Sequence, residues 1–158
     1  MATFTNSDKD ETKAYGAITM FRQILVPVDF SDANDAAVKH AVDLATQSGG
    51  AISLLHVIEL IAGENDDEFK DFYAFLDDKA TREMDQLKSR VDVDGVEHHE
   101  VIIFGNRARA ILDHAEENKV DLIVMSSRRL NPDDPHDIAS MSHKVAILAS
   151  CPVLLVKG

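Results

Sequence analysis

The sequence is poor in the features that mark several common classes of protein. It contains one cysteine in 158 residues, so no disulfide can form within the chain. A single thiol is typical of proteins that work in a reducing compartment. Its apolar runs, such as the one from Leu122 to Met125, fall far short of the roughly 20 residues that a membrane-spanning helix needs. No basic segment followed by an apolar signal core stands at the N-terminus. We therefore expect a cytoplasmic protein without membrane insertion.

Basic residues are also scarce. Lysine and arginine number 16 against 28 aspartates and glutamates, which gives a formal net charge of −12. A nucleic-acid partner would require a basic face, so we do not expect one. Hydrophobic residues make up 45% of the chain, which is enough for the core of a single domain of this length.

Short β-branched runs alternate along the chain with longer segments that have apolar residues at helical spacing. Near-continuous apolar runs are typical of strands that a parallel sheet buries on both faces, and the alternation predicts an open, doubly wound α/β domain. The predicted strands are residues 24–28, 52–57, 101–104, 122–125 and 153–156, and the helical faces span 37–45, 69–91, 108–115 and 138–148.

The ends of the first helix and of the chain carry further signals. Ser31 and Asp32 are suitable side chains to cap the helix, and Gly49 with Gly50 marks its end. Residues 1–20 show no helical or strand period and are predicted to form a flexible tail, with one domain from 21 to 158. The long loop at 128–137 follows a strand, where open α/β sheets bind ligands.

Several segments, taken in order, resemble the universal stress protein family from Phe21 to Lys157. They are Ile24-Leu25-Val26-Pro27-Val28-Asp29-Phe30-Ser31, His56-Val57, Asp121-Leu122-Ile123-Val124-Met125, Ser142-His143-Lys144-Val145 and Cys151-Pro152-Val153-Leu154-Leu155-Val156. The resemblance implies a five-stranded parallel sheet in the order 3-2-1-4-5, a Rossmann-like fold of the adenine-nucleotide alpha-hydrolase type. It also implies a regulatory role in the stress response and a homodimer.

In nucleotide-binding members of that family, the phosphates lie on a loop with the pattern G-x2-G-x9-G-[ST] after the fourth strand. Carried onto this chain, the three glycines fall on Ser126, Arg129 and Ala139, followed by Ser140. Glycine lets backbone N–H groups approach a phosphate, and a Cβ narrows that approach. We therefore predict a degraded ATP loop and a protein that acts through contacts with an unidentified protein partner. ATP with magnesium is the alternative cofactor, in a nucleotide sensor.

Other positions still match the adenine and ribose pocket that the resemblance implies: Pro27, Asp29, Val57, Met125 and Ser140. Asp29 follows an apolar strand at its carboxyl end, where it would meet a ribose hydroxyl or a metal-bound phosphate. The alternative role for the Asp29 carboxylate is to cap the first helix.

Remaining polar residues have plainer explanations. Arg107, Arg109, Arg128 and Arg129 follow strands and could hold an anion, but solvated pairs with surface carboxylates are the favoured interpretation. A metal site at 133–137 is likewise less favoured than capping, since adjacent loop residues rarely converge on one ion. His56 is expected to be a satisfied histidine of the core or rim, and Cys151 a buried small residue.

No catalytic residue is predicted, because the chain has neither a G-x-S-x-G elbow nor a G-x4-G-K-[ST] loop. An enzyme such as a slow nucleotide hydrolase is the least favoured hypothesis. The run from Val153 to Val156 would form the outermost strand of the sheet and lacks an internal proline or lysine. An exposed apolar edge invites pairing, so we predict a homodimer in which this strand meets its two-fold mate antiparallel.

Overall fold

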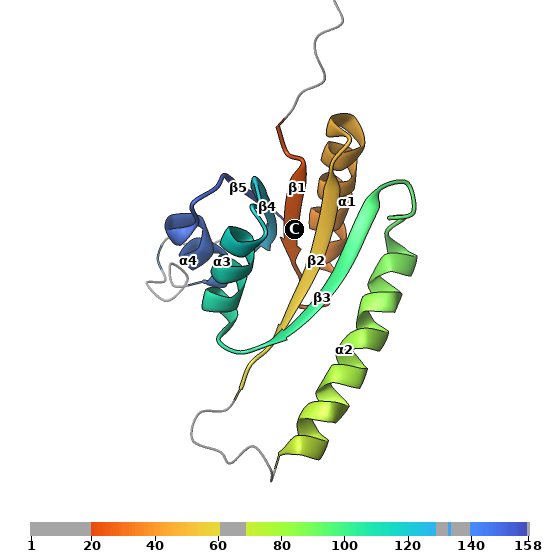
Figure 1. Ribbon diagram of the computed structural model, residues 1–158, viewed down its shortest axis with the longest axis vertical. Helices are drawn as coiled ribbons and strands as arrows, with labels where there is room; N and C mark the ends of the chain where they lie inside the picture. The colour runs from red at the N-terminus through yellow and green to blue at the C-terminus, as the bar shows by residue number, and fades with distance from the viewer. Residues whose placement is uncertain (1–19, 61–68, 129–132, 134–139, 158) are drawn as a thin grey trace, which may run out of the picture.

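The computed structural model describes residues 20–60, 69–128, 133 and 140–157, in which helices flank a five-stranded sheet (Figure 1). The elements alternate along the chain as the sequence predicts. They are β1 (Gln23–Pro27), α1 (Ala33–Ser48), β2 (Ala51–Ile58), α2 (Lys70–Arg90), β3 (Glu97–Phe104), α3 (Arg107–Glu117), β4 (Leu122–Ser127), α4 (Met141–Leu148) and β5 (Val153–Lys157).

The strands are ordered β3-β2-β1-β4-β5 and every neighbouring pair is parallel, which confirms the expected topology. The chain winds outward from β1 in one direction to reach β3, and then returns to the other side of β1 to form β4. At such a reversal the loops after the two adjacent strands diverge and leave a crevice at their carboxyl ends. The sheet therefore places a candidate binding site beyond β1 and β4.

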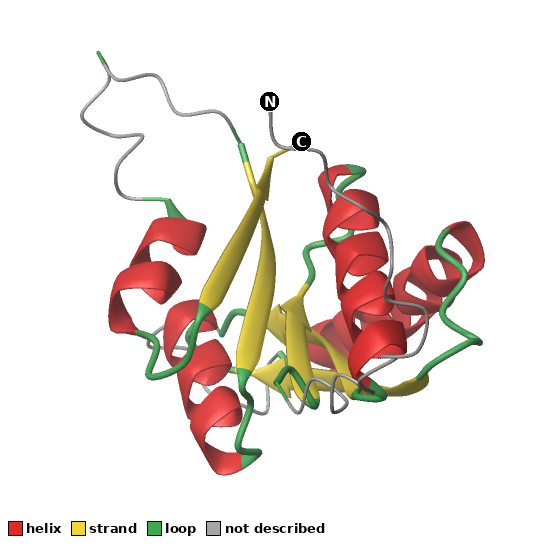
Figure 2. Ribbon diagram, turned by 90° about the horizontal axis from the view of Figure 1, so that it is seen from above, coloured by secondary structure: helices red, strands yellow, loops and turns green. Residues whose placement is uncertain are grey.

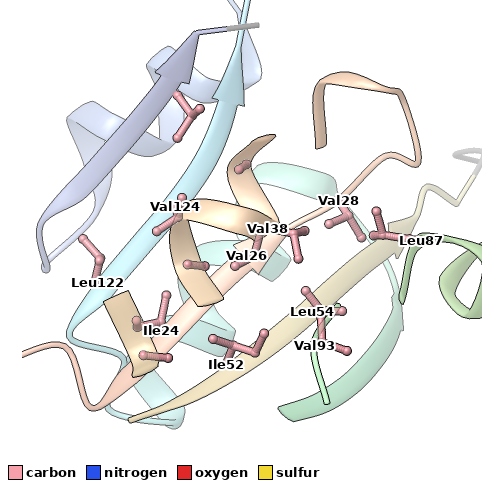
Figure 3. Close-up of a cluster of buried hydrophobic side chains, with 14 of the residues drawn as sticks. Ile24, Val26, Val28, Val38, Ile52, Leu54, Leu87, Val93, Leu122 and Val124 are labelled. Atoms are coloured by element: carbon pink, nitrogen blue, oxygen red, sulfur yellow. The ribbon is translucent and has the colours of Figure 1, made fainter. Parts of the chain in front are cut away.

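Helices cover both faces of the sheet, as Figure 2 shows from above. The helices α1 and α2 pack on one face, where alanines and a valine of α1 lie against Ile24 and Val26 of the central strand (Figure 3). The helices α3 and α4 pack on the other face against Leu25 and Ile123. Successive side chains of a strand point to opposite faces, which explains why the strands read as unbroken apolar runs.

The ends of α1 agree only in part with the sequence prediction. Gly49 ends the helix with a left-handed φ of 64°, as expected. Asp32 occupies the N-cap position, but its side chain makes no capping hydrogen bond. The predicted side-chain cap is therefore wrong. The turn before the helix is held instead by Asp29, whose Oδ1 accepts hydrogen bonds from the backbone nitrogen and the hydroxyl of Ser31.

Two further observations concern the extent of the elements. The strand β3 begins at Glu97, four residues before the predicted start. The prediction missed these residues because they are polar and largely exposed, so they form no apolar run. No helix within the described ranges is long and apolar enough to cross a membrane. The predicted N-terminal tail, except for Met20, and most of the predicted loop at 128–137 lie outside the described residues.

Candidate functional site

A cavity of about 250 Å³ lies at the carboxyl ends of β1, β2 and β4, at the point where the winding direction reverses. Six of the eight residues that the sequence singled out line it: Pro27, Asp29, Val57, Met125, Ser126 and Ser140. The other two, Arg129 and Ala139, lie outside the described residues. The structure thus gathers residues from four separate segments around one space.

Part of the cavity lining is apolar. Val57 and Met125 are 5% and 6% exposed, and they stand at the ends of strands on either side of Pro27. Ile111 of α3 adds a further aliphatic side chain to the lining. Ligand pockets are usually lined by apolar side chains, with a few polar groups that orient the ligand.

Asp29 combines the two roles that the sequence left open. It lines the cavity, and its Oδ1 lies 3.0 Å from the Ser31 backbone nitrogen and 2.7 Å from the Ser31 hydroxyl. Phe30, which lies between Asp29 and Ser31 in the sequence, adopts a φ of 66°, a conformation that few non-glycine residues occupy. The carboxylate thus holds a strained turn at the rim, and both of these bonds use the same oxygen.

His56 is a satisfied rim histidine, as predicted. Its Nδ1 donates to the carbonyl of Val28 at 2.9 Å, which binds β2 to the residue after β1. The ring stacks on Phe30 with 4.4 Å between centroids. His56 also lines the cavity, and because Nδ1 is already bonded, its other ring nitrogen is the one left for a ligand.

Asn34 is a buried residue of the cavity lining that sequence reasoning missed. It is 1% exposed in the first turn of α1, and its Oδ1 accepts from the Asp29 backbone nitrogen at 2.8 Å. Its Nδ2 donates to the Ser126 hydroxyl at 3.0 Å. The available signal was its position three residues before Ala37, because that spacing places a polar residue on the buried face of the helix.

Two arginines reach the cavity from different strands. Arg107, which follows β3, and Arg128, which follows β4, both line it. Arg107 lies 3.2 Å from Glu59, and Arg109 lies 3.4 Å from Asp113 outside the cavity, so these two form the surface pairs that were expected. Arg107 and Arg128 therefore come from the ends of separate strands to the lining of one cavity.

Serines at the start of α4 complete the polar side of the cavity. Ser140 occupies the N-cap position, and its hydroxyl lies 3.3 Å from that of the buried Ser142. The first N–H groups of a helix have no partner within the helix. This end of α4 therefore adds hydrogen-bond donors to a cavity that already contains the Ser126 hydroxyl.

Metal binding and thiol chemistry find little support in the described ranges. No group of three or more His, Cys, Asp or Glu side chains that could hold a metal occurs there. Of the acidic loop, only Asp133 is described. Cys151 is only partly buried, not fully as predicted; it packs against the core beneath α3 and α4, and this burial raises the pKa of its thiol. A thiol with a raised pKa is a poor nucleophile at neutral pH.

Comparison with known proteins yields consistent matches along the chain. The model of the universal stress protein family matches residues 20–157. Universal stress protein YxiE of Bacillus subtilis is 31% identical over 148 residues, covering 87% of this chain and all of the relative. Universal stress protein MJ0577 of Methanocaldococcus jannaschii is 28% identical over 155 residues, covering 87% and 96%.

Solved structures agree with these sequence matches. A structure of MJ0577 superposes with a TM-score of 0.73 at 29% identity, covering 88% of this chain and 97% of the other. Universal stress protein UspA from Lactobacillus plantarum superposes with a TM-score of 0.71 at 27% identity, covering 87% and 98%. The similarity extends over nearly the whole length of both relatives.

Proposed function

The chain belongs to the universal stress protein family, and from this premise we propose that it is a regulatory protein of the stress response that acts through protein contacts. In this proposal the cavity can still hold a nucleoside, but it binds ATP only weakly in the position that nucleotide-binding relatives use. The proposal includes a cytoplasmic location, which the single cysteine supports.

One observation carries the proposal: the two sides of the cavity differ in how well they match a nucleotide site. The apolar side is assembled from Pro27, Val57 and Met125, with Asp29 at the rim. On the phosphate side, the place of the first motif glycine is taken by Ser126, whose hydroxyl is held by Asn34. A side chain at this place reduces access to the backbone N–H groups that would cradle a chain of phosphates. We therefore propose that the apolar side accepts a nucleoside and that the other side binds a triphosphate only weakly.

Action through protein contacts is favoured over catalysis by the chemistry of the cavity. The only histidine that lines it, within the described ranges, has Nδ1 bonded to a backbone carbonyl. The single cysteine lies elsewhere, just before the start of β5. The sequence also lacks the glycine and lysine loop that NTPases use to hold phosphates.

A nucleotide sensor that binds ATP is the second candidate. It is favoured by the presence of Arg107 and Arg128 on the lining of the same cavity. Guanidinium groups bind phosphate oxygens bidentately, so they would replace part of what the missing glycines supply. This candidate requires a measurable affinity for ATP, whereas the first does not.

We also propose that the regulatory unit is a homodimer joined through β5. This strand is one of the two edge strands of the sheet and lies next to β4. Beside it on α4, Ile147 and Leu148 are 74% and 64% exposed, and Leu154 on the strand is 37% exposed. An unpaired strand edge flanked by exposed aliphatic side chains is a favourable surface for a second copy.

Mass spectrometry of the purified protein under non-denaturing conditions tests both parts of the proposal. The expected result is an assembly of twice the chain mass of 17.4 kDa without bound ATP. Co-purified ATP in most assemblies would favour the sensor, and a monomer at micromolar concentration would exclude the β5 homodimer.

A further inference from the structure

The orientation of the Asn34 side-chain amide is fixed by its neighbours. The backbone nitrogen of Asp29 can only donate, so the Asn34 atom 2.8 Å from it must be the amide oxygen. The amide nitrogen therefore faces the Ser126 hydroxyl oxygen at 3.0 Å. Since an amide nitrogen only donates, the Ser126 oxygen accepts this bond.

This arrangement determines where the Ser126 proton can point. A serine hydroxyl has one proton and two lone pairs, and the bond from Asn34 occupies a lone pair. Within the described residues, the Ser126 hydroxyl donates to no protein acceptor, and the residue lines the cavity. The Ser126 proton is thus available to an acceptor atom of a ligand.

The other polar groups on the same lining indicate which acceptor it would be. Arg107, which also pairs with Glu59, and Arg128 are cations, and the mutually bonded hydroxyls of Ser140 and Ser142 leave one further proton to donate. Donors and positive charge together match a phosphate, and hydrogen bonds to a charged acceptor are stronger than those to a neutral one. Because the sequence has side chains where the family motif has the glycines that would hold further phosphates, a single phosphate suits these donors best.

We infer that Asn34, by directing the Ser126 hydroxyl proton into the cavity, makes the site prefer a nucleoside monophosphate over the unphosphorylated nucleoside. Asn34 is a positioning residue, and Ser126 is the residue that touches the ligand. The inference rests on the proposed function, because it requires that the cavity bind a nucleoside at all.

Calorimetric titration of the full chain with AMP and, separately, with adenosine tests this preference. In the wild type, AMP is expected to bind roughly ten-fold or more tightly than adenosine, as one charge-assisted hydrogen bond would give. Ser126→Ala removes the donor and should reduce that ratio strongly while leaving adenosine affinity within about three-fold. Asn34→Asp keeps an acceptor for the Asp29 backbone nitrogen but accepts the Ser126 proton, so it should reduce the ratio as well.

The double variant Asn34→Asp, Ser126→Ala distinguishes two ways in which Asn34→Asp could weaken AMP binding. One is that the new carboxylate redirects the Ser126 proton, and the other is that its negative charge repels the phosphate. If the new carboxylate acts only by capturing the Ser126 proton, Asn34→Asp in the Ser126→Ala background changes the AMP to adenosine ratio little further. A large further loss would show direct repulsion of the phosphate, and would overturn the role of Asn34 as a positioning residue. Circular dichroism and a melting curve for each variant establish that it folds, and Ser126→Ala alone still tests the donor if Asn34→Asp does not.

The outcomes distinguish this inference from the proposed function. Equal affinity of the wild type for AMP and adenosine, or a ratio that Ser126→Ala leaves unchanged, overturns the inference while the nucleoside site remains. Binding of neither ligand contradicts the nucleoside site of the proposed function itself, and with it the inference.

Discussion

The amide nitrogen of Asn34 lies 3.0 Å from the hydroxyl oxygen of Ser126, although 92 residues separate them in the sequence. The bond joins the first turn of α1 to the end of β4 across the reversal of the sheet. The same asparagine accepts from the backbone nitrogen of Asp29 after β1. One buried side chain thus fixes three segments of the candidate site relative to one another.

Replacing Val153 by proline should separate the subunits of the proposed homodimer. The Ile123 nitrogen donates to the Pro152 carbonyl at 3.0 Å, and alternate residues of a strand face the same neighbour. The N–H of Val153 therefore points away from β4, toward a second copy, and proline removes it. Light scattering should report about twice 17.4 kDa for the wild type and a shift toward the monomer for Val153→Pro. A variant that stays fully dimeric would exclude this interface.

The stability of the protein should fall as the pH drops below neutrality, in part through His114. Burial lowers the pKa of His114 from its ordinary value of 6.5, against a smaller opposing effect of Glu117. Below pH 6.5 the unfolded chain therefore binds a proton that the folded chain does not, and the free energy of unfolding decreases. Urea titrations at about pH 7.5 and about pH 5.5 should show a smaller loss for His114→Gln than for the wild type. An equal loss in both proteins would contradict this assignment.

Deleting residues 1–19 should change the stability of the domain little. The segment has no apolar period with which to pack on the core, so its removal should shift the melting midpoint by no more than about 2–4 °C, the change that roughly 1 kcal/mol produces in a domain of about this length. A larger drop, or a loss of solubility, would show that the segment covers apolar surface.

Restoring the motif glycines should strengthen ATP binding. The variant with Ser126→Gly, Arg129→Gly and Ala139→Gly regains backbone that a phosphate can approach closely. Calorimetry with ATP and magnesium should show at least a ten-fold gain in affinity over the wild type, or about 1.4 kcal/mol. A variant that folds but shows no gain would mean that the side chains at these three positions do not limit ATP binding.

The sequence predicts the sheet well because its strands are buried on both faces. Leu25 and Val26 point to opposite cores, so the run around them is apolar throughout and stands out from the helices. The start of β3 escaped notice for the converse reason. Its residues from Glu97 to Glu100 lie on an outer edge where one side is solvated, and an apolar run is absent.

The polar contacts of the site could be predicted only in part. Adjacency of Asp29 to the end of a strand follows from local sequence, and so does its place at the rim. The partnership of Asn34 with Ser126 depends on how α1 packs against β4, which no local pattern specifies. The same holds for the side-chain cap of α1, since Asp29 and not Asp32 is the carboxylate that bonds the turn.

Calorimetric titration of the wild-type protein with ATP and magnesium tests the central claim most directly. We predict binding far weaker than the low micromolar range, because Ser126, Arg129 and Ala139 stand where the family motif has glycine. Asp29→Ala and Ser140→Ala serve as matched variants, since both residues line the cavity. A low micromolar affinity for ATP in the wild type that is lost in both variants would contradict the claim that the substituted loop weakens ATP binding. It would establish instead that the protein is an ATP sensor.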